Sequence, residues 1–278
     1  MGRLITAEFR KIFTVKLWWA LLIPAVLLSL GFTWAGSALG TLGELQEEVG
    51  GAVPFALPAF AQGINFTTVF AVILGATAVT SEMRHKTITT TYLTGSSRGA
   101  VLTAKLITYT VMGLVYGVAC MGAATLGALF GGDLPDGALW FELAGVGVLA
   151  LMMWTLLGVG AGALIGNQTG AIVGLVIYTL ILEPIVAQIL RSNDAEKIPF
   201  YLPNGSGSGM VSDLSLDLFV EGFPGGHGDD VGRAIEEIRG FLNLDGAPAW
   251  WASMLIFLAW SAVIGLSGWL VAKQRDIT

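Results

Sequence analysis

The chain has 278 residues, of which 54% are hydrophobic and 12% are charged, and its formal net charge is −6. Soluble globular domains contain about 25% charged residues, so this composition excludes an ordinary soluble protein and predicts one that lies in a lipid bilayer. The acidic balance also argues against nucleic-acid binding.

The apolar runs are about 20 residues long and show no alternation of apolar and polar positions, which favours membrane-spanning helices over a barrel. Helices satisfy their backbone hydrogen bonds internally, as the hydrocarbon core requires. We therefore expect an all-α integral membrane protein with six transmembrane helices. Residues 1–278 would form a single transmembrane domain.

Residues 3–16 place apolar side chains on one helical face, with Arg10, Lys11 and Thr14 largely opposite. This pattern predicts an amphipathic helix over residues 1–16 that lies in the membrane interface. The same stretch also resembles the charged start of a signal peptide, because small residues follow at 35–38. The apolar run that follows is longer than a usual signal sequence, which favours the interfacial helix.

The six spans are expected at increasing distances along the chain, separated by short polar or Gly-rich segments. The fifth span meets Glu183 and Pro184, where the missing amide of proline should break or kink the helix. The predicted spans are 17–39, 63–79, 101–130, 139–165, a fifth that starts at about 171, and 250–272.

On this topology ten of the 14 Lys and Arg residues fall on one side of the membrane, and about sixteen of the 20 Asp and Glu residues fall on the other. Basic segments are retained in the cytoplasm, so the pattern predicts cytoplasmic termini in a multi-pass protein of the cell membrane. Lys105 lies near the inner boundary, and we expect its ammonium group to snorkel to the interface.

Residues 191–249 form a long external segment between the last two spans. Its middle, from 203 to 228, contains GSGSG at 205–209 and is expected to be a flexible linker. Residues 229–242 show helical periodicity. The segment could cap an exit path or lie passively on the membrane surface.

No G-x-x-x-x-G-K-[ST] phosphate loop occurs, so the chain has no ATP site of that kind. The two histidines, His85 and His227, fall on opposite sides and cannot share a metal or a catalytic triad. Cys120 is the single cysteine and is expected to be a small buried residue. We therefore expect no catalytic, metal or cofactor site in this chain.

Glu183 is the one ionisable residue deep in the fifth span. On insertion scales, placing a charged residue at the centre of a membrane helix costs about 2.5–3.5 kcal/mol of free energy. The presence of Glu183 in the span therefore needs an explanation. It could contact a substrate or gate in a cavity, or its carboxylate could reach the outer interface where Pro184 ends the helix. G-x-x-x-G pairs such as Gly158/Gly162 predict tight packing within the bundle.

Residues 80–105, TSEMRHKTITTTYLTGSSRGAVLTAK, connect the second and third spans and carry a large share of the positive charge. This pattern resembles the corresponding loop of permeases of the type-2 ATP-binding-cassette exporter family. The likeness extends to six spans, cytoplasmic termini and a long external excursion before the last span. It rests on Glu82, Arg84, Thr87, Ile88, Tyr92, Leu93, Ser97, Arg98, Lys105 and Leu106.

The resemblance implies that residues 80–100 form a coupling helix, which seats in a cleft of a separate ATPase subunit that binds ATP and Mg. Apolar anchors inside a polar rim are typical of such interfaces. The anchors would be Ile88, Tyr92 and Leu93, and the remaining coupling residues would be Glu82, Arg84, Lys86, Thr87 and Arg98. Alternatively the loop only obeys the positive-inside rule, and Glu82 pairs locally with Arg84.

The family likeness further implies an efflux path between two permease chains, identical or sister subunits, that works by alternating access. Spans one, two and five would line it, with Asn65, Thr67, Thr68 and Glu183 as candidate path residues. The three residues of span two could equally satisfy one another within the bundle. Two other functions remain open: an ion-coupled secondary transporter or channel, and a membrane anchor or sensor.

Overall fold

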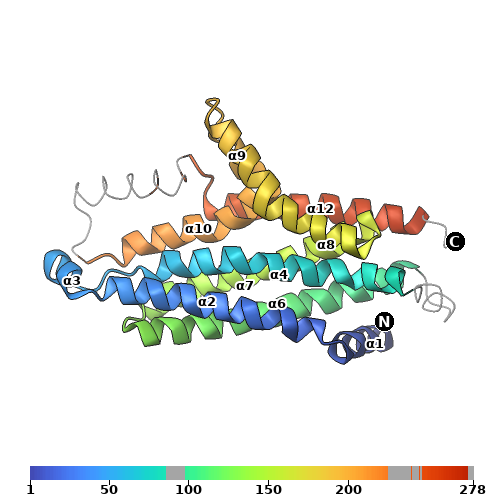
Figure 1. Ribbon diagram of the computed structural model, residues 1–278, viewed down its shortest axis with the longest axis horizontal. Coiled ribbons are helices and arrows are strands. Elements are labelled where there is room, and N and C mark those ends of the chain that lie inside the picture. The colour runs from blue at the N-terminus through green and yellow to red at the C-terminus, as the bar shows by residue number, and fades with distance from the viewer. Residues whose placement is uncertain (86–97, 225–238, 240–243, 245, 275–278) are drawn as a thin grey trace.

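A computed structural model describes residues 1–85, 98–224, 239, 244 and 246–274 (Figure 1). All regular secondary structure in these residues is helical. In chain order the elements are α1 (Gly2–Thr14), α2 (Leu17–Gly40), α3 (Gly43–Val49), α4 (Ala56–Arg84), α6 (Arg98–Gly131), α7 (Gly137–Ile165), α8 (Gln168–Ile177), η1 (Tyr178–Leu182), α9 (Glu183–Arg191), η2 (Ile198–Tyr201), α10 (Pro203–Glu221) and α12 (Trp250–Gln274).

Six helices of the described chain are long and apolar enough to cross a membrane, which confirms the predicted all-α, multi-pass architecture. The second span, α4, begins at Ala56 rather than at the predicted residue 63. Pro58 lies in the first turn of α4, where a proline costs no hydrogen bond. It therefore does not prevent the helix from starting at Ala56, and the helix also includes the polar Gln62. The spans are Leu17–Gly40, Ala56–Arg84, Gly99–Gly131, Gly137–Ile165, Gln168–Arg191 and Trp250–Val271.

Helices α4 and α7 form the centre of the bundle. Of their most apolar windows, 72% and 67% are buried, against 17% for α2 and 11% for α12. Helix α2 packs against α4 and α6, α6 also packs against α7, and α12 packs against α7. Figure 1 shows α1 and the last turn of α12 at the same end of the bundle.

Glycines bring the backbones of α4 and α7 into direct contact. A Cβ atom on Gly75 would lie 2.0 Å from the carbonyl oxygen of Thr155, and one on Gly158 would lie 2.2 Å from that of Val72. Gly162 approaches the backbone of α4 in the same way. The Gly158/Gly162 pair and Gly75 therefore serve packing within the bundle.

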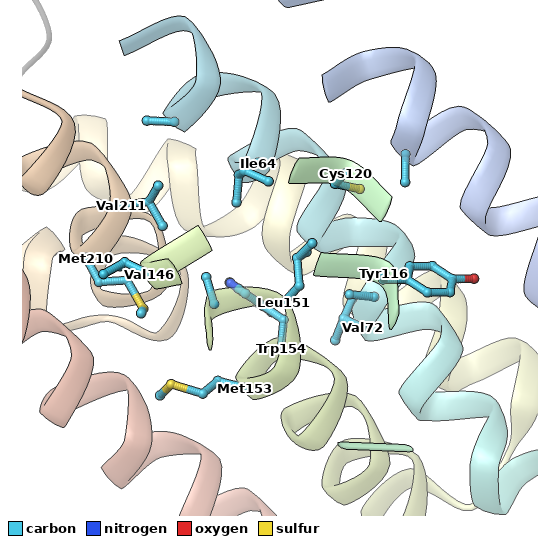
Figure 2. Close-up of a cluster of buried hydrophobic side chains, with 14 of the residues drawn as sticks. Ile64, Val72, Tyr116, Cys120, Val146, Leu151, Met153, Trp154, Met210 and Val211 are labelled. Carbon is cyan, nitrogen blue, oxygen red and sulfur yellow. The ribbon is translucent and has the colours of Figure 1, made fainter. Parts of the chain in front are cut away.

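Large side chains fill the space around this contact. Trp154 of α7 packs against Phe257 of α12 with ring centroids 4.8 Å apart. Figure 2 shows Trp154 near Met210 and Val211 of α10, so α10 belongs to the same core. Cys120 is buried and free, in line with its expected role as a small core residue.

The sequence predicted that the fifth span breaks or kinks at Pro184. The helix does not break there but continues to Arg191 through a π-helical turn at Tyr178–Leu182. The Glu183 amide donates to the carbonyl of Tyr178, five residues earlier, and this wider turn accommodates the missing amide of Pro184. Beyond it, α9 projects away from the bundle (Figure 1).

The prediction of a flexible linker at 203–228 is wrong for most of that stretch. Residues Pro203–Glu221 form helix α10, which packs against α4, α7 and α12. A Cβ atom on Gly205 would lie 1.9 Å from the Pro199 carbonyl oxygen, and one on Gly207 would lie 2.9 Å from Trp154 Nε1. The glycines therefore permit close packing and do not serve as a linker.

The predicted helix at 229–242 lies outside the described residues except for Arg239. The guanidinium group of Arg239 pairs with the buried carboxylate of Asp213 on α10. Burial, together with repulsion from Asp217, raises the pKa of Asp213 even though Arg239 opposes the shift.

Candidate functional site

Four charged side chains meet at the end of the bundle that holds α1 and the last turn of α12, and we call them the ionic cluster. Lys105 of α6 lies 2.7 Å from Glu8 Oε2 of α1 and 2.8 Å from Glu82 Oε1 of α4. Lys11 of α1 lies 2.7 Å from Glu8 Oε1 and 2.6 Å from Glu82 Oε1. Each carboxylate thus contacts both ammonium groups, and the three helices are joined at one point.

Three of the four side chains of the ionic cluster are buried. Glu8, Glu82 and Lys105 are 5%, 7% and 3% exposed, and Lys11 is the partly exposed member. Partial burial opposes the charge of Lys11, but its hydrogen bonds to Glu8 and Glu82 prevail and raise its pKa above the ordinary value. Two carboxylates and two ammonium groups balance, which makes the burial of charge tolerable.

Lys105 therefore does not snorkel to the interface as expected. Its ammonium group points into the bundle because Glu8, which is 97 residues away in sequence, supplies a buried partner. Glu82 likewise finds its lysine partners on α1 and α6, not only in its own neighbourhood. A local sequence pattern cannot predict such partners, because they lie on other helices.

The cluster lies at both ends of the predicted coupling segment. Glu82 belongs to the last turn of α4 and Lys105 to an early turn of α6, and residues 86–97 connect these helices. Arg84 is exposed, and its guanidinium donates to Gln168 Oε1 at 3.3 Å. The remaining predicted coupling positions, Lys86, Thr87, Ile88, Tyr92, Leu93 and the side chain of Arg98, lie outside the described part of the chain.

A cavity of about 560 Å³ lies between α4, the π-turn with α9, η2 and α10. We call it the lateral cavity. It brings together three of the four candidate path residues, Asn65, Thr68 and Glu183. Thr67 is not among its lining residues; it is buried and its hydroxyl donates to the Ile64 carbonyl at 2.8 Å.

Polar contacts within the cavity wall join α4 to α10. The Asn65 side-chain amide donates to Ser212 Oγ at 2.9 Å, and the Thr68 hydroxyl donates to the Asn65 carbonyl at 2.6 Å. The donor groups of the three span-two residues are therefore satisfied by backbone carbonyls and by α10, whereas Asn65 Oδ1 is buried and has no hydrogen-bond partner among the described residues. The sequence left open that the three side chains bond to one another, and the structure shows no such network among them.

Glu183 caps helix α10. Its Oε2 accepts from the Asn204 amide at 2.9 Å, and its Oε1 accepts from the Gly205 amide at 2.6 Å. These amides belong to the first turn of α10, where donors lack helical partners and the helix dipole favours negative charge. Glu183 is only 3% exposed, so its carboxylate does not reach the outer interface and instead lies in the cavity wall.

One face of α9 lines the cavity at helical spacing, with Pro184, Ala187, Gln188 and Arg191 at i, i+3, i+4 and i+7. The sequence predicted a break or a kink at Pro184 and did not single out this face of α9. Reading the helix through Pro184 to Arg191 would have revealed the periodicity.

No group of three His, Cys, Asp or Glu side chains within the described ranges could hold a metal ion. The fold and these two sites define a six-span helical membrane protein, with a buried ionic cluster at one end and a polar cavity beside the bundle. Comparison with protein-family models gives no match, and comparison with curated proteins gives none either.

Proposed function

We propose that this chain is the permease subunit of an ATP-driven exporter of the type-2 ATP-binding-cassette kind. It would provide the substrate path but no catalysis, and a separate ATPase subunit would bind ATP and Mg. The residue pattern of 80–105, the six spans and the helical excursion before α12 support this assignment. The chain would sit in the cell membrane with cytoplasmic termini and pair with a second permease chain.

The ionic cluster is the observation that carries the proposal. A partner that moves residues 86–97 acts on α4 and α6, and the cluster fastens both helices to α1. Buried ion pairs resist separation, because removing one partner leaves an uncompensated charge. A force on the loop is therefore delivered to three helices together.

Helix α4 connects this junction to the lateral cavity. It carries Glu82 at one end and Asn65 and Thr68 in the cavity wall. At about 1.5 Å per residue, Glu82 and Asn65 lie about 26 Å apart along the helix. A tilt of α4 at the loop would change the contacts of its far half with α9 and α10, as alternating access requires two sets of contacts.

An ion-coupled transporter is the alternative, and the buried charges favour it less. Such a protein needs ionisable groups at depth that bind and release an ion or proton. Among the described residues, the buried acidic and basic side chains of the spans are Glu82, Lys105 and Glu183, and each is held by partners within the chain. None stands ready to exchange a proton without losing a structural contact.

Co-purification tests the proposal. Ile88→Asp combined with Tyr92→Asp should leave membrane insertion intact but abolish recovery of a phosphate-loop ATPase with the tagged chain. The matched control, Leu42→Asp with Leu134→Asp, changes two exposed leucines at the other end of the bundle and should retain the ATPase. Unchanged co-purification in the first variant would refute the coupling role. Transport by the chain alone, driven by an ion gradient in liposomes, would establish the alternative.

A further inference from the structure

The lateral cavity is lined by a charged side chain that has no partner among the described residues. Arg191 ends α9, is half-buried and lines the cavity. In the described part of the chain its side chain makes no hydrogen bond or ion pair. The other charged residue of the wall, Glu183, has both carboxylate oxygens occupied by amides of α10.

Two uncommitted amides lie in the same wall. Gln188 precedes Arg191 by one helical turn, and Gln62 lies on the facing surface of α4. Both side chains are exposed, and no hydrogen bond of either is found within the described ranges. Arg191 is about 12 Å along α9 from Glu183, so the available cation and the capping carboxylate occupy separate parts of the cavity.

Apolar side chains complete the lining. Phe66 and Val69 of α4 and Leu180 of the π-turn contribute to the wall, and Phe66 and Leu180 are 43% and 48% exposed. A volume of about 560 Å³ falls within the range of about 300–1,000 Å³ that is usual for small-molecule sites. The cavity thus combines a guanidinium group that is unpaired within the described ranges, two amides and an apolar surface.

We propose that the lateral cavity binds an amphipathic organic anion, with the anionic group on Arg191 and the apolar body against Phe66, Val69 and Leu180. A planar guanidinium binds carboxylates and phosphates through paired hydrogen bonds, and these strengthen where water is scarce. This substrate class rests on the proposed transport function. The anion could be a free small molecule or a lipid headgroup, which share this chemistry.

Binding can be measured on the complete chain without any ATPase. The chain is placed in nanodiscs of phosphatidylcholine and titrated with dansylglycine, a fluorescent anion, and with dansylamide, its neutral counterpart. Dansylglycine should bind at least about tenfold more tightly than dansylamide, because only the anion pairs with Arg191.

Substitutions locate the site. Arg191→Gln should weaken the binding of dansylglycine about tenfold and leave the binding of dansylamide unchanged. Arg191→Lys should keep part of the preference for the anionic probe. Ala187→Phe, which fills the cavity from α9, should weaken both probes. Arg10→Gln, an exposed arginine on α1, is the matched control and should change neither. Equal binding of the two probes, or an Arg191→Gln variant that binds like the unaltered chain, overturns the assignment.

A second arm distinguishes the two sources of the anion. If phosphatidylglycerol in the nanodisc displaces dansylglycine from the unaltered chain but not from Arg191→Gln, the ligand is a lipid headgroup; if it does not compete, the ligand is a free anion. Loss of anion binding with retained ATPase co-purification would reject the substrate class alone. Anion binding without any ATPase partner would reject the proposed coupling alone.

Discussion

The carboxylate of Glu82 and the ammonium group of Lys105 lie 2.8 Å apart in the interior of the bundle. They join the end of α4 to the beginning of α6, so the segment between them closes into a loop with a fixed base. Glu8 and Lys11 add α1 to the same base. The ends of this loop cannot move independently without breaking a buried ion pair.

Lys105→Met should destabilise the protein severely. It removes one of two cations that neutralise Glu8 and Glu82, and loss of one partner from a buried pair costs roughly 3–5 kcal/mol. Thermal unfolding in detergent would show the drop in melting temperature. Lys16→Met, which removes an exposed lysine at the same end, should have little effect. A Lys105→Met protein as stable as the unaltered chain would mean that the cluster does not hold the helices.

The contribution of Lys11 to the free energy of unfolding should not change with pH until the solution is strongly alkaline. Its pKa in the folded protein is raised above the ordinary value of about 10.5, because hydrogen bonds to Glu8 and Glu82 outweigh its partial burial. Stabilisation from a raised lysine pKa is fully present below the unfolded value and is lost as the pH rises through the folded value. The stability difference between the unaltered chain and Lys11→Met should therefore be constant from about pH 7 to 9 and shrink above about pH 10.5. A change near neutrality would contradict this assignment.

Glu183→Ala should loosen helix α10. The change leaves the amides of Asn204 and Gly205 without an acceptor in a buried place, at a cost of roughly 1–3 kcal/mol. Glu183→Gln keeps one acceptor oxygen and should lose less. Hydrogen exchange over residues 203–221 would report the loosening directly. Glu142→Ala, an exposed carboxylate on α7, is the control and should leave that exchange unchanged.

Gly205→Ala should be strongly disfavoured, because its Cβ would lie 1.9 Å from the Pro199 carbonyl oxygen. Overpacking of this kind costs about 1–3 kcal/mol. At Gly174 of α8 a Cβ would meet nothing within 4 Å, so Gly174→Ala should stabilise the helix by up to about 1 kcal/mol. Melting temperatures of the two variants should move in opposite directions. A Gly205→Ala protein of unchanged stability would argue for a mobile linker at 205–209 after all.

The sequence by itself determined that this protein lies in a lipid bilayer and how many spans it has. Long apolar runs must become helices in hydrocarbon, whatever their neighbours are, so composition and length were sufficient. The sequence also pointed to Asn65, Thr68 and Glu183 as candidate path residues; the structure gathers them at one cavity, while their role in transport stays a prediction. Arg191 was not singled out, because it stood at the start of the predicted external segment.

Only the tertiary structure decided what the buried polar groups do. Lys105 is paired and not snorkelled because Glu8 comes from a distant helix, and Glu183 caps amides that follow it by about twenty residues. Residues 205–209 are helical, and glycine stands at 205 and 207 because Pro199 and Trp154 leave no room for a Cβ atom. Local periodicity reports which face of a helix is apolar, but the partner of a buried charge or glycine is chosen by packing between segments far apart in the chain.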